Sequence, residues 1–125
     1  HGCLVGSEMC IRDSVVIFTA GTGNPFFTTD TAGCLRAIET QSNLMLKATR
    51  VDGVYSADPE TNKDAVFYDS LSFDEAIQQN LKIMDATALT LARDHSLPIK
   101  VFDFSKENAL LDIACGKSIG TLISS

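Results

Sequence analysis

The sequence contains no apolar run that approaches the roughly 20 residues needed to cross a membrane as a helix. It is also poor in positive charge: 10 lysines and arginines stand against 16 aspartates and glutamates, which gives a net charge of −6. Such an acidic chain is unsuited to a nucleic-acid groove or an anionic membrane surface as its main partner. A small phosphorylated ligand stays compatible with this charge, because local amides and a few cations can hold it. We therefore expect no nucleic-acid partner and no membrane partner.

Patterns that carry metal or nucleophilic chemistry are scarce as well. The histidines and cysteines show no spacing typical of a metal site, so we predict no metal ligands of this kind. No Ser-His-Asp or Cys-His order emerges that would indicate a catalytic nucleophile. Cys34 and Cys115 lie outside any C-x-x-C motif. We expect them to be free thiols, buried or half-buried, in a reducing cytosol.

The first fourteen residues differ from the rest of the chain. Residues 1–14 show neither the alternation of a strand nor the apolar stripe of a helix, and they hold two of the four cysteines. They are similar to a sequencing adapter translated in frame, so we interpret them as a leader foreign to the natural protein. Residues 15–125 then form the natural part, whose length corresponds to one domain or less. The composition, 45% hydrophobic and 21% charged, is typical of a folded globular chain.

Apolar runs and helical spacing predict an α/β arrangement in the first part of the chain. Four consecutive apolar residues open the segment 15–19, which we predict to be a buried strand. A helix is predicted over 30–39 and a second buried strand over 44–48, so the three elements would form one parallel βαβ unit. The loops that follow parallel strands lie at the same edge of the sheet, where α/β proteins bind ligands.

The later elements are predicted from turns, caps and alternation. Ser72 and Glu75 form a capping-box pattern, and Gly116 has the position expected of a residue that ends a helix. We predict an edge strand over 65–68, helices over 72–80, 85–96 and 107–115, and strands over 99–104 and 120–123. The predicted fold class is α/β, with a mostly parallel sheet and flanking helices.

A glycine-rich loop follows the first predicted strand and leads into the first helix. Gly21 and Gly23 allow the main chain to approach an oxyanion, and the free N–H groups at a helix start point toward it. The hydroxyls of Thr22, Thr28 and Thr29 add hydrogen-bond donors. The pattern predicts a phosphate site, although an ordinary loop with a Thr or Asp N-cap accounts for it equally well.

Two charged residues follow at positions that suit such a site. Lys47 stands in the apolar run of the second strand, where it could hold a phosphate as a point charge or pair with Asp52 or Asp58. Asp58 could hold cations or order water beside phosphates, or it could only form the turn before Pro59. Asp85, which precedes the longest predicted helix, is fully explained as an N-cap.

Several stretches together resemble the bacterial uridylate kinase (UMP kinase) family, whose members have the amino-acid-kinase fold. The matching segments are residues 21–30, 46–49, 51–59, 84–85 and 89–94. The segment 51–59 is shared with kinases of this fold that act on aspartate, acetylglutamate or glutamate. The segment 21–30, Gly-Thr-Gly-Asn-Pro-Phe-Phe-Thr-Thr-Asp, is much more selective for the UMP enzymes. The likeness covers residues 15–123 and corresponds to the carboxyl-terminal half of these enzymes.

The resemblance implies transfer of the γ-phosphoryl group of ATP to UMP, giving UDP, with Mg²⁺ bound together with the ATP. By their positions in the matching segments, Asn24 and Asp58 are implied to be catalytic. Lys47 is a third candidate catalytic residue because it stands in the apolar run of the second strand. The implied UMP contacts are Thr22, Gly23, Asn24, Pro25, Phe26, Phe27, Thr28 and Thr29. The implied ATP contacts are Thr49, Tyr55 and Asp58.

The same resemblance implies a partial amino-acid-kinase fold, truncated at its amino-terminal side, with residues 15–125 as the nucleotide-binding part. Family members are cytoplasmic homohexamers, often regulated by GTP and UTP. Because the family's amino-terminal half carries a phosphate-holding lysine, we expect the fragment to be inactive alone. Residues 41–43 and 107–108 depart from the family pattern at places peripheral to the site. Two alternatives stay open: another kinase of this fold, and a non-catalytic nucleotide-sensing module.

Overall fold

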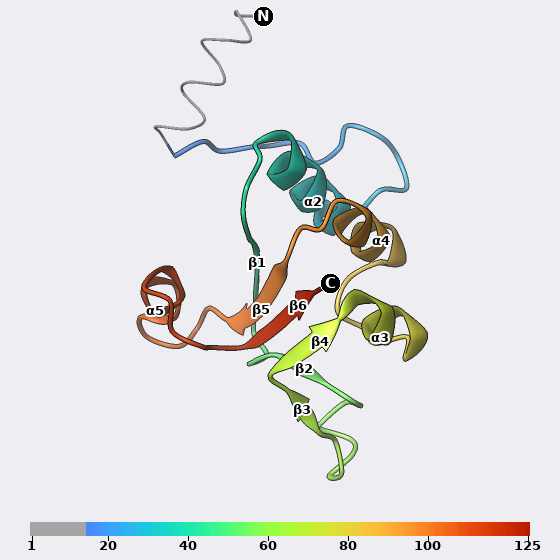
Figure 1. The fold of residues 1–125 in the computed structure, drawn as a ribbon, viewed down its shortest axis with the longest axis vertical. Helices are drawn as coiled ribbons and strands as arrows, with labels where there is room; N and C mark the ends of the chain where they lie inside the picture. Colours follow the sequence, from blue (N-terminus) through green and yellow to red (C-terminus); the bar gives the residue numbers. More distant parts are fainter. Residues whose placement is uncertain (1–14) are drawn as a thin grey trace, which may run out of the picture.

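A four-stranded sheet forms the centre of the computed structural model, which describes residues 15–125 (Figure 1). The strand order is β1-β5-β6-β4, with β1 and β4 at the edges. The β1–β5 and β4–β6 pairs are parallel, and the β5–β6 pair is antiparallel. The strands span Met45–Thr49 (β1), Ser70–Ser72 (β4), Ile99–Asp103 (β5) and Thr121–Ser124 (β6). This mixed, mostly parallel sheet with its helices confirms the α/β prediction, whereas the interpretation of residues 1–14 lies outside the described part.

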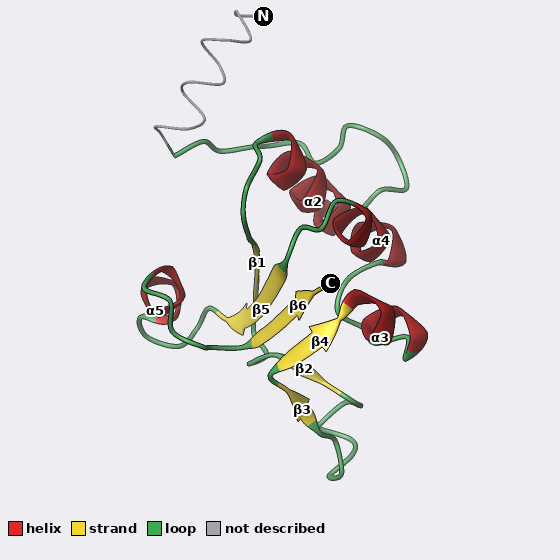
Figure 2. Ribbon diagram, in the orientation of Figure 1, coloured by secondary structure: helices red, strands yellow, loops and turns green. Residues whose placement is uncertain are grey.

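Helices lie on both sides of this sheet, as Figure 2 shows. They span Thr29–Glu39 (α2), Phe73–Gln78 (α3), Ala86–Asp94 (α4) and Ala109–Ala114 (α5). Along β5, Ile99 and Val101 point into the main core, which also holds side chains of α2, α3 and α4. Phe102 points the opposite way and packs against α5. This alternation has the period of two that a strand imposes, so β5 forms part of both apolar layers. None of the helices in the described part is long and apolar enough to cross a membrane.

A small second sheet extends from the first. Strands β2 (Val54–Tyr55) and β3 (Phe67–Tyr68) pair antiparallel, and the rings of Tyr55 and Phe67 meet edge to face at 5.2 Å. The buried hydroxyl of Thr121 on β6 accepts from the main-chain N–H of Val54 at 2.8 Å and donates to the carbonyl of Tyr68 at 2.5 Å. One side chain thus fastens this hairpin to the central sheet. The predicted edge strand at 65–68 is confirmed at its last two residues.

The prediction of a buried strand over 15–19 is wrong. These residues form no strand, and Val15 and Ile17 are 96% and 84% exposed. Figure 1 shows the segment running past the end of α2 rather than along β1. An apolar run is buried only where a strand neighbour and covering helices are present, and β1 pairs with β5 alone among the described strands. The expected βαβ unit is therefore absent, and β1 is half-buried rather than buried.

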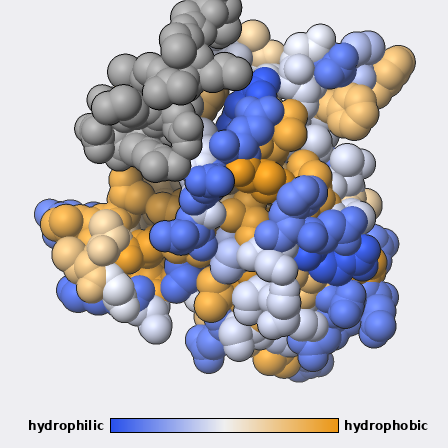
Figure 3. Space-filling view, turned by 45° about the horizontal axis from the view of Figure 1, so that its top comes forward, coloured by the Kyte–Doolittle hydropathy of each residue, from blue (hydrophilic) through white to orange (hydrophobic). Residues whose placement is uncertain are grey.

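Apolar surface is also exposed on the α5 side of the molecule. Leu110 and Leu111 of α5 are each 60% exposed, and Figure 3 shows hydrophobic surface on that side. Cys34 is buried as expected, whereas Cys115, which follows α5, is exposed, contrary to prediction. Both are free thiols, as predicted. A six-residue helix covers too little of the sheet to bury the residues at its own end.

The helices begin and end with recognisable local signals. The predicted capping box is present at α3, where the hydroxyl of Ser72 accepts from the N–H of Glu75 and the Glu75 carboxylate accepts from the N–H of Ser72. In each of the four described helices, the second residue after the helix has a positive φ: these residues are Gln41, Asn80, Ser96 and Gly116. In each case the main-chain N–H of this residue and the N–H of the residue after it donate hydrogen bonds to carbonyl oxygens in the last turn of the helix. Only the glycine was predicted, because glutamine and serine seldom adopt this conformation and asparagine adopts it less readily than glycine.

Replacing Ser96 by glycine tests the strain at one of these helix ends. Ser96 is exposed and has a φ of 51°, so Ser96→Gly should raise the free energy of unfolding by about 0.5–1 kcal/mol in urea titrations. The reverse change at a matched position, Gly116→Ala at a φ of 87°, should lower it by about 1 kcal/mol. Equal stability of the two variants would contradict this explanation.

Candidate functional site

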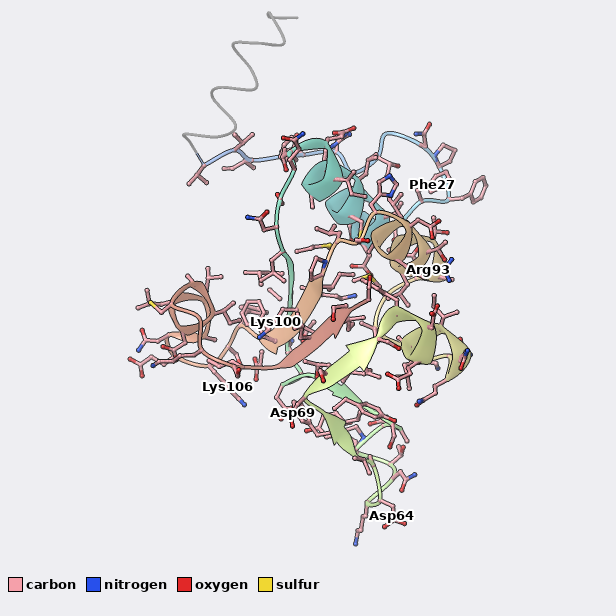
Figure 4. All side chains as sticks on the ribbon, in the orientation of Figure 1. Phe27, Asp64, Asp69, Arg93, Lys100 and Lys106 are labelled. Carbon is pink, nitrogen blue, oxygen red and sulfur yellow. The ribbon has the colours of Figure 1, made fainter. Side chains whose placement is uncertain are left out.

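The glycine-rich loop, residues 21–28, stands exposed ahead of α2. The Thr22 hydroxyl accepts from the N–H of Asn24 at 3.1 Å, which folds the loop into a tight turn. Phe26 is completely exposed and has a positive φ of 70°, a strained conformation for an aromatic residue. Figure 4 shows Phe27 projecting from the loop on the outer side of α4. Loop atoms other than those of Thr28 are thus turned to solvent rather than packed into the core.

The start of α2 is tied to the start of α4 by one carboxylate. Asp85, the N-cap of α4, accepts from the hydroxyls of Thr28 and Thr31 at 2.5 Å and 3.0 Å and from the N–H of Ala88 at 3.4 Å. Burial acts to raise the pKa of Asp85, but these hydrogen bonds to the charged form outweigh it, and the pKa lies below its usual value. The predicted N-cap role is confirmed. The contacts of Asp85 with Thr31 and Thr28 span separations of 54 and 57 positions in the sequence, so no local sequence pattern predicts them.

Lys47 lies in the middle of β1 on the face that carries the main core. Its Nζ donates to Asp30 Oδ2 at 2.8 Å and to the carbonyl oxygen of Ile83 at 2.7 Å. The lysine side chain is 20% exposed and that of Asp30 29% exposed, so the pair is partly shielded from water. The alternative that Lys47 pairs with Asp52 or Asp58 is therefore wrong. Asp30 and Ile83 were not predicted, because neither lies within a motif that points to the strand.

A cleft of about 490 Å³ opens between the β2–β3 hairpin and the segment after α3. All three of the residues expected to contact ATP, Thr49, Tyr55 and Asp58, line it. Its other lining residues are Val51, Gly53, Val54, Ser56, Ala57, Pro59, Gln79, Asn80, Leu81, Lys82, Ile83 and Val101. The size and the apolar floor with few polar groups are typical of a small-molecule site.

Polar groups at the cleft are held by short local bonds. The Tyr55 hydroxyl donates to both oxygens of Asp52 at 2.9 Å and 3.0 Å, and this hydrogen bond raises the pKa of Tyr55. The carboxylate of Asp58 accepts from the N–H of Glu60 at 2.9 Å, so the turn-forming role of Asp58 is present. Asp58 is exposed and is one of the residues that line the cleft. The Thr49 hydroxyl donates to main-chain oxygens and orients the end of β1.

The loop and the cleft meet through Lys47. Asp30 stands in the first turn after the loop, and Ile83 is part of the cleft wall, and both bind the same ammonium. In register, Lys47 faces Val101 of β5, another cleft residue. The structure thus brings Thr28, Lys47 and the cleft residues into one connected region. Residues 22–27 do not line the cleft.

Comparison with known proteins identifies the class. A model of the amino acid kinase family matches residues 7–103, and the chain belongs to this family. The amino-acid-kinase fold expected from the motifs is thereby confirmed.

Relatives within the family are more specific. The chain is 58% identical over 113 residues to the uridylate kinase of Yersinia pestis (strain Pestoides F), a match that covers 90% of this chain and 47% of that protein. It is also 58% identical over 110 residues to the uridylate kinase of Vibrio cholerae, covering 88% of this chain and 45% of that protein. The chain therefore spans about half the length of the curated relatives it matches.

Solved structures agree with the sequence matches. The UMP kinase of Bacillus anthracis superposes with a TM-score of 0.92 at 40% identity, covering 96% of this chain and 50% of that one. The UMP kinase of Ureaplasma parvum superposes with a TM-score of 0.89 at 40% identity, covering 99% and 54%. The resemblance to the carboxyl-terminal half of the UMP kinases is thus confirmed.

Removing the charge of Asp85 tests the tie between the two helix starts. Asp85→Asn should lower the free energy of unfolding at pH 7 by about 1–2 kcal/mol, because three donors then bind a neutral group. The folded pKa is depressed, so this stabilisation is present above the unfolded pKa near 4 and is lost as the pH falls through the lower folded value.

Urea titrations at pH 7 and pH 3 provide the measurement. The difference in the free energy of unfolding between the unsubstituted chain and Asp85→Asn should be smaller at pH 3 than at pH 7. Asp64→Asn, in an exposed loop, should change this free energy little at either pH. A difference that is the same at both pH values would show that the charge of Asp85 is not what holds the loop.

Proposed function

We propose that this chain forms the carboxyl-terminal half of an enzyme that transfers the γ-phosphoryl group of ATP to UMP and so produces UDP. The single observation that carries the proposal is the Asp30–Lys47–Ile83 contact, which connects a phosphate-type loop to a nucleotide-sized cleft. The 58% identity to proteins named uridylate kinase supports UMP as the acceptor. The segment 21–30, which the resemblance makes selective for the UMP enzymes, also favours UMP over the amino-acid substrates of other kinases of this fold.

In this proposal the cleft holds the donor, ATP. Thr49, Tyr55 and Asp58 line one side of it, and its volume of about 490 Å³ lies within the range of small-ligand sites. Tyr55 is oriented by Asp52 and by the ring of Phe67, so its position is defined before a ligand binds. Such preorganisation lowers the entropic cost of binding.

The loop ahead of α2 holds the acceptor. The proposed contacts to UMP are Thr22, Gly23, Asn24, Pro25, Phe26, Phe27, Thr28 and Thr29. Amide groups at the start of an eleven-residue helix provide partial positive charge for the phosphate of UMP. Asn24, held by Thr22, would fix the acceptor within the loop.

Catalysis then consists of positioning and electrostatics. Phosphoryl transfer needs the two nucleotides aligned and the charge of the transferring group neutralised, rather than covalent chemistry by the protein. Lys47 is the cation between loop and cleft, and an ammonium has three donors, of which Asp30 and Ile83 take two. Mg²⁺ bound together with ATP would supply positive charge that neutralises the phosphates. The exposed carboxylate of Asp58 suits a magnesium ion held chiefly by phosphates, which needs only one or two protein carboxylates.

Other properties of the whole enzyme belong to the same proposal. We propose a cytoplasmic homohexamer that responds to GTP and UTP, and we propose that the 125-residue chain alone does not turn over UMP. The exposed apolar surface of residues 15–18 and of α5 supports the last point, because these side chains need covering elements.

The role of Asp58 is tested in a hybrid that joins residues 15–125 to the amino-terminal half of the Yersinia pestis uridylate kinase. Asp58→Asn keeps an oxygen for the N–H of Glu60 but removes the negative charge at the cleft. It should lower kcat for UDP formation by about 100-fold, measured by coupled assay.

Asp64→Asn is the matched control, since Asp64 lies at the far tip of the hairpin loop (Figure 4). Activity of the control should stay within about twofold of the hybrid. An Asp58→Asn variant as active as the control would refute the catalytic role.

The acceptor and the need for the second half are tested together. The hybrid should phosphorylate UMP and leave aspartate, acetylglutamate and glutamate unchanged, whereas the 125-residue chain should give no product above background, as measured by nucleotide chromatography. Phosphorylation of an amino acid would favour the other kinases of the fold. Binding of nucleotide by the hybrid without any transfer would favour a sensing module, and turnover by the isolated chain would contradict its inactivity.

A further inference from the structure

One lysine contacts both of the proposed substrate sites. Lys47 Nζ lies 2.8 Å from Asp30 Oδ2 and 2.7 Å from the carbonyl oxygen of Ile83. Asp30 belongs to the first turn of α2, directly after the glycine-rich loop, and Ile83 belongs to the cleft wall. A side chain on β1, itself anchored in the central sheet, therefore connects the two sites by two charge-assisted hydrogen bonds.

At the cleft wall, Lys47 donates to the main-chain carbonyl of Ile83. Ile83 lies between α3 and α4, outside any helix or strand, so no ladder supplies a donor to its carbonyl group. A buried main-chain carbonyl needs such a donor, and Ile83 is only 8% exposed. Lys47 supplies it, so this ammonium fixes the cleft rim at Ile83, whereas residues 79–81 are held by hydrogen bonds to α3 and to Tyr68.

A second connection two residues further on closes a ring. Asp85 binds the hydroxyls of Thr28 and Thr31, so the segment 83–85 touches the start of α2 through both Lys47 and Asp85. Two such connections on either side of Met84 restrict the segment in position and in rotation. A displacement of the cleft rim therefore displaces the start of α2 and the loop before it.

Resting on the proposed donor cleft and acceptor loop, we propose that Lys47 is a positioning residue that couples occupancy of the cleft to the geometry of the loop. A nucleotide in the cleft fixes the rim at Ile83, and Lys47 transmits this position to Asp30. The amide donors of the loop are then aligned for an acceptor only when a donor is present.

Nuclear magnetic resonance of the ¹⁵N-labelled 125-residue chain tests the coupling. The probe is a magnesium complex of a non-hydrolysable ATP analogue, so the acceptor loop receives no ligand of its own. In the unsubstituted chain, addition of this complex should shift the amide signals of three cleft residues, Thr49, Tyr55 and Asp58. The signals of Asp30 and Thr31 should shift along the same titration curve.

Three variants separate positioning from stability. Lys47→Met removes the ammonium, and Asp30→Asn leaves the ammonium in place but weakens its hold on α2. Lys100→Met is the matched control: Lys100 is half-buried on the neighbouring strand and lies on the α5 side of the sheet, away from the ring (Figure 4). Because Asp85 still joins the two segments, the shifts at Asp30 and Thr31 should fall by about half or more in the first two variants, and they should be unchanged in the control. The shifts at the cleft should persist in all three.

The outcomes are distinct. Shifts at Asp30 and Thr31 that are undiminished in Lys47→Met and Asp30→Asn, or that are absent from the unsubstituted chain while the cleft signals move, would overturn the coupling and leave the donor site standing. If Lys47→Met does not fold, Asp30→Asn decides between these results. A natural chain in which no signal moves would overturn the donor assignment and, with it, the coupling. Loss of the cleft shifts in Lys47→Met alone, with Asp30→Asn behaving as the natural chain, would make Lys47 a phosphate ligand instead.

Discussion

A partly shielded ion pair between a strand and a helix holds the functional region together. Lys47 reaches from β1 to Asp30 at the start of α2, and the same ammonium satisfies a carbonyl in the connection between α3 and α4. Such a pair is of value only while every partner is present, because a lone charge in this position would be costly. Lys47 therefore fixes β1, the first turn of α2 and the segment at Ile83 relative to one another, while Asp85 joins the starts of α2 and α4.

The core near this pair contains a cysteine thiol, Cys34, that is unreactive at neutral pH. Cys34 of α2 is fully buried and donates its S–H to Met45 of β1 at 3.3 Å. Burial chiefly, followed by the charges of Asp30 and Asp85, raises the pKa of the thiol to about 11. The thiol is therefore protonated at neutral pH and does not act as a nucleophile beside the proposed substrates. Helix α2 also lies close to β1, since a Cβ added to Gly33 would come within 2.8 Å of the Met45 methyl, which would have to move aside.

Much of the fold was predictable because its signals are local. The helix starting near residue 30, the capping box at Ser72 and the alternation in β5 each depend on neighbours within one or two turns, and each is confirmed. The strand predicted over 15–19 failed because burial depends on elements that a sequence pattern does not name. Two- and three-residue strands such as β2 and β4 are too short to show alternation.

The candidate site divides in the same way. Thr49, Tyr55 and Asp58 lie in one continuous motif, so their shared cleft follows from the order of the chain. The partners of Lys47 and Asp85 come from positions 17 to 57 residues away, and only the folded chain brings them together. Physical reasoning could require a partner for a lysine in an apolar strand, but it could not choose Asp30 over Asp52 or Asp58.

The hydroxyl of Thr121 has a consequence for how this chain is made. It bridges the main chain of Val54 and Tyr68, so the hairpin that forms one side of the cleft depends on a residue more than fifty positions later. Translation proceeds from the amino terminus, and during that interval the hairpin lacks its partner on β6. A nascent polypeptide that has emerged from the ribosome only as far as α5 therefore cannot yet hold this side of the cleft in its finished geometry.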